Sequence, residues 1–185
     1  MTLLHWTLTV GLVAALVGVV VAADEPPKTI KADDLSFKVP AEWKKETPKS
    51  SMRKAQLRVE PVKGDDEPAE MTLFVFAGGA GTVEANIDRW EKQFVDADRR
   101  TPKAKIEKKK GVNVDVTRVE VSGRYVAATM PGAATKNDKP NYRLLGAIVE
   151  TKDAGYFFKL TGPEKTVADA SKAFDQMIES MKLDK

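Results

Sequence analysis

The most promising set of polar side chains lies on one predicted helix, where Asn86, Arg89 and Gln93 follow one another at helical spacing. This spacing places the three side chains on one helix face, beside Trp90. Amide and guanidinium donors next to an aromatic ring could hold a carboxylate, a phosphate or a glycan. The same donors could instead bind backbone carbonyls of neighbouring loops, which is the more common use of such side chains. The sequence therefore predicts a ligand site at these four residues, with a structural role as the alternative.

A second candidate, formed by Gly79, Gly81 and Thr82, lies just before that helix. The free N–H groups and the dipole of a helix N-terminus favour anions, so these residues predict an anion-binding loop. The segment has neither the Lys-Ser/Thr ending of a P-loop nor a G-x-G-x-x-G pattern, which excludes both nucleotide-binding loops. A flexible connection between a strand and a helix is the alternative.

A third candidate is the basic segment 99–110, in which Glu107 is the single acidic residue. Its basic residues are Arg99, Arg100, Lys103, Lys105, Lys108, Lys109 and Lys110. They could contact an anionic membrane or another polyanion. No aromatic residue is interleaved to stack bases, which argues against single-stranded nucleic acid. The alternative is an edge strand that lysines keep soluble.

The residue types that the sequence lacks exclude several kinds of chemistry. There is no cysteine, and the single histidine, His5, lies in the N-terminal segment. Ser-His-Asp triads, Cys-His pairs and Cys/His zinc sites are therefore excluded from residues 24–185. The S-x-x-K match at residues 51–54 lacks the companion motifs of penicillin-recognising enzymes. We expect no catalytic residue, no metal and no cofactor.

The N-terminal segment predicts export. Residues 1–23 contain no Asp, Glu, Lys or Arg, residues 10–23 are apolar or small, and Val21-Ala22-Ala23 forms a cleavage site before Asp24. These features are typical of a secretory signal peptide. An uncleaved membrane anchor is the alternative, because residues 3–23 are long enough to span a bilayer. We expect a signal peptide (1–23), a lead-in segment (24–34) and one domain (35–185) in the periplasm or outside the cell.

Hydrophobic periodicity within residues 35–185 predicts an α+β domain. Alternating or dense apolar residues predict strands at 35–39, 55–59, 71–76, 103–110, 112–123, 143–150 and 156–160. A change in the phase of alternation predicts a bulge near Thr117-Arg118. The predicted strands form one largely antiparallel sheet.

Two amphipathic helices accompany the predicted sheet. The first extends over about residues 83–95 after a cap at Thr82, and the second follows a cap at Thr166. Apolar residues recur at helical spacing in both. In the second helix they are Val167, Ala170, Phe174, Ile178 and Met181.

Three segments resemble the PsbP/Mog1-like superfamily: Phe37-Lys38-Val39-Pro40-Ala41-Glu42-Trp43, the first helix, and Phe-x-x-Met-Ile-x-Ser-Met from Phe174 to Met181. The closer resemblance is to uncharacterised exported bacterial proteins with an Asn-x-x-Arg-Trp-x-x-Gln-Phe helix, which is Asn86 to Phe94 in this sequence. The resemblance covers most of residues 24–185. It implies a three-layer α/β/α sandwich and a non-enzymatic role in binding or assembly.

These observations favour an exported, monomeric, non-enzymatic binding or assembly protein. Its partner is expected to be a protein or a ligand of the cell envelope, and not a nucleic acid, because the net charge is only +3. One alternative is a cofactor-free hydrolase that uses carboxylate, lysine or tyrosine chemistry. Another is a structural envelope component that contacts anionic surfaces through residues 99–110.

The predicted cleavage site can be tested on protein purified from its native host. Its intact mass should correspond to residues 24–185, because the signal peptidase removes the apolar segment after Ala23. A mass that includes residues 1–23 would contradict cleavage and favour the membrane anchor.

Overall fold

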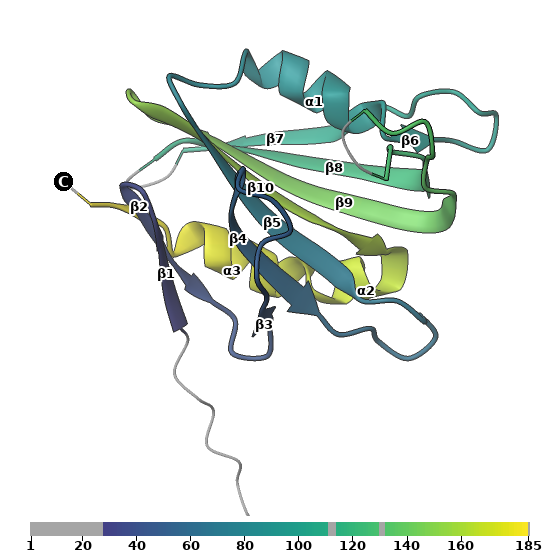
Figure 1. Cartoon of the computed structure of the whole chain (residues 1–185), viewed down its shortest axis with the longest axis horizontal. Coiled ribbons are helices and arrows are strands. Elements are labelled where there is room, and N and C mark those ends of the chain that lie inside the picture. The colour runs from purple at the N-terminus through teal and green to yellow at the C-terminus, as the bar shows by residue number, and fades with distance from the viewer. Residues whose placement is uncertain (1–27, 111–113, 130–131, 185) are drawn as a thin grey trace, which may run out of the picture.

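The computed structural model describes residues 28–110, 114–129 and 132–184. Strands and helices in these residues are shown in Figure 1. The strands are β1 (Lys28–Ala32), β2 (Leu35–Val39), β3 (Lys44–Lys45), β4 (Arg53–Val59), β5 (Ala69–Ala77), β6 (Phe94–Val95), β7 (Lys105–Lys109), β8 (Val116–Tyr125), β9 (Lys139–Glu150), β10 (Ala154–Pro163) and β11 (Lys182–Leu183). The helices are α1 (Val83–Glu91), α2 (Glu164–Asp169) and α3 (Ser171–Glu179).

The predicted signal peptide and its cleavage site lie outside the described residues. Among the residues that are described, no helix is long and apolar enough to cross a membrane.

The larger sheet is antiparallel throughout its described pairs. Its strand order is β3-β4-β5-β10-β9-β8-β6, and β7 pairs with another part of β8. Strands β1, β2 and β11 form a small separate sheet. Helix α1 lies on one face of the larger sheet and helices α2 and α3 lie on the other (Figure 1). The predicted α+β architecture with helices on both faces is confirmed.

Side chains on alternate positions of each strand enter two separate hydrophobic clusters. On β10, Tyr156, Phe158 and Leu160 join the cluster beneath α2 and α3, whereas Phe157 joins the cluster beneath α1. We call the side of the larger sheet that carries Phe157 the α1 face. Because both faces are covered along β9, residues 144–149 are buried without interruption, as expected of a central strand.

Helix α1 begins as predicted but ends earlier. The Thr82 hydroxyl accepts a hydrogen bond from the Ala85 amide at 3.1 Å, which confirms the predicted cap. The helix ends at Glu91, and Phe94 and Val95 form β6, which pairs with the end of β8. Phe94 is fully buried in this strand. Phe94 keeps the helical spacing of the apolar residues, but it is buried on a strand and not on the helix. Periodicity alone cannot distinguish these two cases.

Two further boundaries differ from the prediction. Residues 28–32 of the expected lead-in segment form β1, which pairs with β2 along its whole length. The last helix is divided at Ala170 into α2 and α3. Thr166 is not the cap, because α2 begins at Glu164 with Pro163 at the N-cap position. The Thr166 hydroxyl instead donates to the Asp65 carboxylate at 2.7 Å. The five apolar residues predicted for this helical region are all buried.

The predicted bulge near Thr117-Arg118 is also wrong. The register of β8 is regular there and shifts between Gly123 and Tyr125. Val116 packs in the cluster beneath α2 and α3, whereas Val119 and Val121 pack in the cluster beneath α1. Since helices cover both faces of the sheet, the apolar residues of β8 can change face without any change in register.

Trp90 fixes the position of α1 against the sheet. Its ring lies over Gly146 of β9, where an added Cβ atom would be 2.2 Å from Cζ3 of Trp90. The Trp90 side chain is therefore accommodated only because residue 146 has no side chain. Trp90 itself is 6% exposed.

Trp90→Ala should lower the free energy of unfolding by about 3–5 kcal/mol, because it removes a large buried side chain. Gly146→Ala should cost about 1–3 kcal/mol through overpacking. Denaturant unfolding of both single variants and the double variant measures these effects. The cost of Gly146→Ala should nearly vanish in the Trp90→Ala background. An equal cost in both backgrounds would contradict the contact.

Candidate functional site

The structure gives Asn86 and Arg89 local structural contacts. Asn86 is 2% exposed, and its Nδ2 donates to the carbonyl oxygens of Ala80 at 3.0 Å and Thr82 at 2.8 Å. Its Oδ1 accepts a hydrogen bond from Arg89 at 3.1 Å. Asn86 thus ties the glycine loop to the start of α1, which agrees with the structural alternative.

The other two residues of the predicted site point to different places. The Trp90 ring is packed against Gly146 and offers no exposed plate to a ligand. The Gln93 side chain accepts a hydrogen bond from Lys159 of β10. The four residues therefore do not converge on one ligand, and Gln93 alone belongs to the polar cluster described below.

The predicted anion-binding loop adopts the turns that its glycines allow. Gly79 has φ +88° and Gly81 has φ +83°, a backbone region that other residues rarely adopt. Thr82 uses its hydroxyl for the cap of α1. Gly81 and Thr82 line a hollow of about 690 Å³ together with Lys108, Lys109 and Lys110. Gly79 is not among the residues that line this hollow.

The predicted polyanion patch is divided. Arg100 pairs with Asp96 and Asp98, Lys103 pairs with the buried carboxylate of Glu91, and Lys105 pairs with Glu107.

Arg99 lies in the turn before β7, with φ +62°. The cross-strand partners of Lys108 and Lys109 are Thr117 and Val116, neighbours whose side chains lie on opposite faces of β8. Strand β7 is an exposed edge strand, as the structural alternative predicted.

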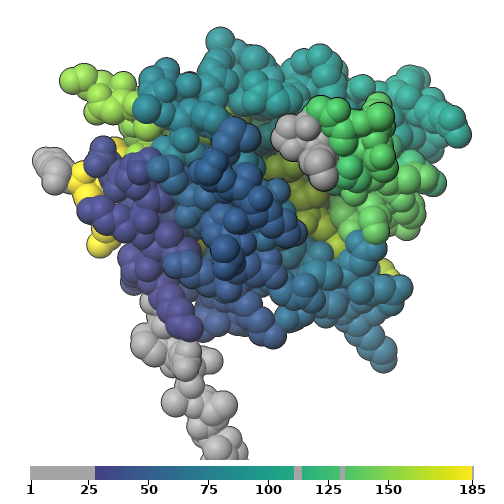
Figure 2. Space-filling model, in the orientation of Figure 1, coloured from purple at the N-terminus to yellow at the C-terminus, as the bar shows by residue number. Residues whose placement is uncertain are grey.

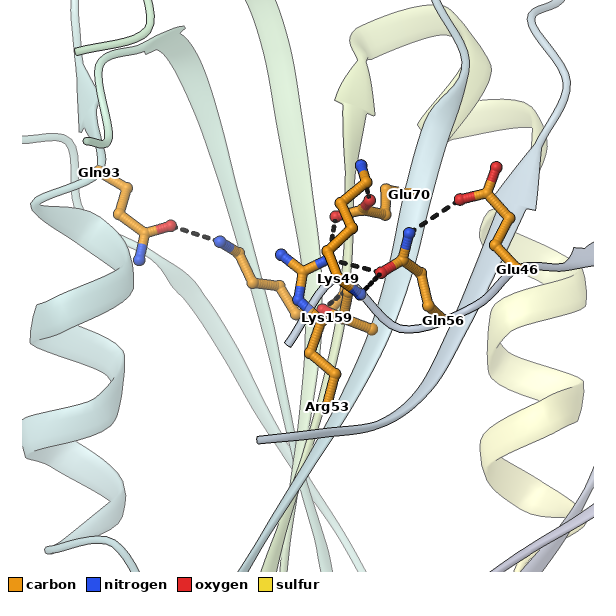
Figure 3. Close-up of polar contacts among 8 residues, drawn as sticks. Glu46, Lys49, Arg53, Gln56, Glu70, Gln93 and Lys159 are labelled. Atoms are coloured by element: carbon orange, nitrogen blue, oxygen red, sulfur yellow. Dashed lines mark hydrogen bonds and ion pairs between the residues drawn. The ribbon is translucent and has the colours of Figure 1, made fainter. Parts of the chain in front are cut away.

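A cluster of polar side chains on the α1 face was missed by the sequence analysis. We call it the sheet-face cluster, and Figure 3 shows most of its members. They are Arg53 and Gln56 of β4, Glu70 and Thr72 of β5, Lys159 of β10, and Gln93 after α1. Gln56 pairs with Thr72, and Thr72 with Lys159, so these three residues form one row across the sheet. Figure 2 shows a hollow in this region, with yellow-green atoms of β10 visible between the dark blue of β4 and the green segment before β9.

Lys159 is the most unusual residue of the sheet-face cluster. Its Nζ donates to Oε1 of Gln93 and lies 5.5 Å from the centre of the Tyr125 ring. No ion pair is found for Lys159 within the described residues. Burial, followed by the positive charge of Arg53, lowers the pKa of the Lys159 ammonium group to about 8, and the charge of Glu70 offsets part of this effect.

Arg53 is held in place on the other side of the cluster. Its NH1 donates to Oε1 of Gln56 at 2.7 Å and to Oε1 of Glu70 at 2.9 Å, and its guanidinium lies 5.9 Å from the centre of the Phe74 ring. The buried Gln56 is itself fixed, because its Nε2 donates to Glu46 at 2.8 Å. These contacts orient the guanidinium while using one of its three nitrogens.

Aromatic residues and an ion pair border the cluster toward the start of β9. The Tyr125 and Tyr142 rings stack with their centres 5.8 Å apart. Glu67 accepts hydrogen bonds from Tyr142, at 2.6 Å, and from Lys139. The Lys139 contact lowers the pKa of Glu67, whereas burial and the bond to Glu67 raise the pKa of Tyr142. The loop between β4 and β5 is thereby fastened to β9 across the intervening strands.

The sequence did contain one signal for this cluster. Lys159 interrupts the apolar run Tyr156-Phe157-Phe158-Lys159-Leu160 of a strand that is expected to be buried. A charged side chain in a central strand requires a specific surrounding. The partners of Lys159 could not be named from the sequence, because they come from distant strands and from a loop.

No group of three or more His, Cys, Asp or Glu side chains comes together within the described residues. The chemistry that this arrangement can perform is that of a desolvated amine beside a guanidinium, an amide and an aromatic ring.

Comparison with known proteins shows the fold. No protein-family profile matches the chain, and no curated protein matches its sequence. Among solved structures, cyanobacterial PsbP (CyanoP) from Synechocystis is similar, with a TM-score of 0.53, 14% identity, and coverage of 92% of this chain and 96% of that protein. The chain has a PsbP-like fold.

A crystal structure from Bacteroides thetaiotaomicron is also similar, with a TM-score of 0.51 and 15% identity. The match covers 87% of this chain and 50% of the Bacteroides protein, so this chain spans about half the length of that protein. At these identities the likeness concerns the fold alone.

The lowered pKa of Lys159 predicts a particular dependence of stability on pH. From about 10.5 down to about 8, the unfolded chain binds a proton at this residue that the folded protein does not bind. The free energy of unfolding should therefore fall, relative to that of Lys159→Met, by about 1–3 kcal/mol as the pH is lowered through this window. Below about pH 8 the difference should stay constant.

Denaturant unfolding of Lys159→Met and of the wild type at a series of pH values measures this difference. The contributions of all other titrating groups to the free energy of unfolding cancel in it. Lys172→Met, which removes an exposed lysine of α3, is the matched control for the loss of a lysine side chain. A constant difference for Lys159→Met would contradict the desolvation of the ammonium group of this half-buried residue.

Proposed function

We propose that this PsbP-like protein is an exported, non-enzymatic binding protein that holds a small carboxylate ligand between Lys159 and Arg53 on the α1 face. The observation that carries the proposal is the ammonium group of Lys159, which is desolvated and has an amide oxygen as its hydrogen-bond acceptor. A buried charge is normally paired with an opposite charge. A carboxylate ligand would supply that charge.

Arg53 supports the proposal because it presents further donors to the same region. NH1 makes its two described hydrogen bonds, which leaves Nε and NH2 to form a fork for a carboxylate. Arg53 bonds to Gln56, which lies in the same cross-strand row as Lys159. The positive charge of Arg53 also lowers the pKa of Lys159. A single bound anion can interact with both.

Thr161 of β10 provides a third argument. It lies two residues from Lys159 and therefore on the same face of the sheet. Its buried Oγ1 has no hydrogen-bond partner within the described part of the chain. Buried hydroxyl groups are usually bonded to protein or ordered water, so a ligand or its bound water would satisfy this one.

The proposal can be tested with acetate, succinate and citrate as probes, by calorimetric titration or by NMR chemical shifts. Arg53→Gln and Lys159→Met should each weaken binding by about 10- to 100-fold, because each removes a charged hydrogen bond. The affinity of the wild type should also fall as the pH rises above about 8, where Lys159 loses its charge.

Lys54→Gln is the control, because Lys54 also lies on β4 but pairs with Asp33. It should bind like the wild type. Binding of no carboxylate, or binding that is indifferent to both site variants, would contradict the proposal. Association with anionic vesicles that is lost in a Lys108→Gln, Lys109→Gln, Lys110→Gln variant would instead favour the envelope component that acts through its basic edge.

A further inference from the structure

The surroundings of Lys159 suit a neutral amine as well as an ammonium ion. The Gln93 amide oxygen accepts one N–H and cannot take a proton from Nζ. A neutral amine can keep this hydrogen bond, because it still carries N–H groups. Its lone pair is then directed away from Gln93, and no carboxylate is described within ion-pair distance of it. The Nζ atom is therefore positioned and left free to react.

Lys159 also differs from other lysines in how much free amine it presents. Because the pKa of Lys159 is about 8, about a quarter of the Lys159 side chains are neutral at pH 7.5. For an ordinary lysine the neutral fraction at this pH is about one part in a thousand. Lys31 and Lys103 are shifted in the opposite direction, because Asp184 and Glu91 raise their pKa values. Neutral lysine amines in desolvated sites act as nucleophiles toward carbonyl groups.

Arg53 restricts which carbonyl compounds would bind best. Its guanidinium is fixed by Gln56 and Glu70, and Gln56 lies in the same cross-strand row as Lys159. A ligand that carries a carboxylate next to a carbonyl could bind Arg53 through its carboxylate and place its carbonyl group at Nζ of Lys159. We infer that the sheet-face cluster captures small oxo acids covalently and reversibly, through an imine between Nζ of Lys159 and the carbonyl carbon while Arg53 holds the carboxylate.

The step needs no oxidant or reductant. The lone pair of Nζ adds to the carbonyl carbon, the C=O π electrons move to the oxygen, and one proton passes from nitrogen to oxygen to give a carbinolamine. The hydroxyl group then leaves as water with one further proton from solvent, and the protonated imine forms. Water reverses both steps. The inference rests on the proposed function, because the carboxylate site is what brings the oxo acid to Lys159.

The test uses the full chain with glyoxylate or pyruvate in the presence of cyanoborohydride at about pH 7.5, followed by proteolysis and peptide mass mapping. Hydride reduces the imine to a stable amine, which marks the residue that reacted. Lys159 should acquire the carboxymethyl or carboxyethyl group at least about tenfold faster than any other lysine. The α-amino group has an ordinary pKa close to 8 and serves as an internal reference for reactivity without a binding site.

Two variants separate the contributions. Lys159→Arg should abolish this modification, and its unaltered circular dichroism spectrum would show that the fold is intact. Arg53→Gln should slow trapping of both oxo acids by about tenfold or more and leave trapping of the neutral aldehyde propanal unchanged.

The outcomes distinguish this inference from the proposed function. If succinate and citrate bind through Arg53 and Lys159 but no oxo acid is trapped at Lys159, the covalent step is overturned and the carboxylate site stands. Labelling spread evenly over the lysines also overturns it. Equal trapping of propanal and glyoxylate, both indifferent to Arg53→Gln, overturns the assignment of oxo acids as the ligand class.

Discussion

The extent of α1 limits how the sheet can be covered. A nine-residue helix is about 14 Å long and about 10 Å wide, whereas the seven strands of the main order are about 29 Å across. Trp90 on Gly146 fixes this helix over β8 and β9. The α1 face of β4, β5 and β10 is therefore left for other groups. The opposite face is covered by α2, α3 and the β1-β2-β11 sheet, and its buried cation, Arg118, is paired with Asp175 of α3 at 2.7 Å.

The uncovered part of the α1 face explains the polar cluster. Polar side chains are tolerated there because neighbouring segments supply partners: Gln56 bonds to Glu46, Arg53 to Glu70, and Lys159 to Gln93. The last contact is the least complete, since a cation is matched with a neutral amide. A desolvated charge without a countercharge costs free energy in the unliganded protein. Such imbalances occur at binding sites, where the ligand supplies the missing partner.

The sequence correctly predicted those strands and helices whose formation depends on residues close together in the chain. The alternation of Leu35, Phe37 and Val39 predicted β2, and Thr82 followed by a helical period predicted the start of α1. Strand β6 could not be predicted, because it forms by pairing with the end of β8, about 30 residues further along the chain. Nothing in the local pattern of apolar residues marked the division of α2 from α3 at Ala170. Helical spacing placed Asn86 and Trp90 near each other but did not reveal that both are turned into the protein. For Lys159, the sequence showed only a charge within an apolar strand.

The central claim is that Lys159 is a desolvated ammonium group awaiting an anionic partner. NMR titration of the lysine side chains, with the Lys159 signal assigned by its loss in Lys159→Met, measures the pKa of this group directly. The account predicts a pKa of about 8 in the unliganded protein and a rise when a saturating carboxylate is added, because a bound anion favours the charged form. A pKa near the ordinary lysine value of about 10.4, unchanged by carboxylates, would contradict it.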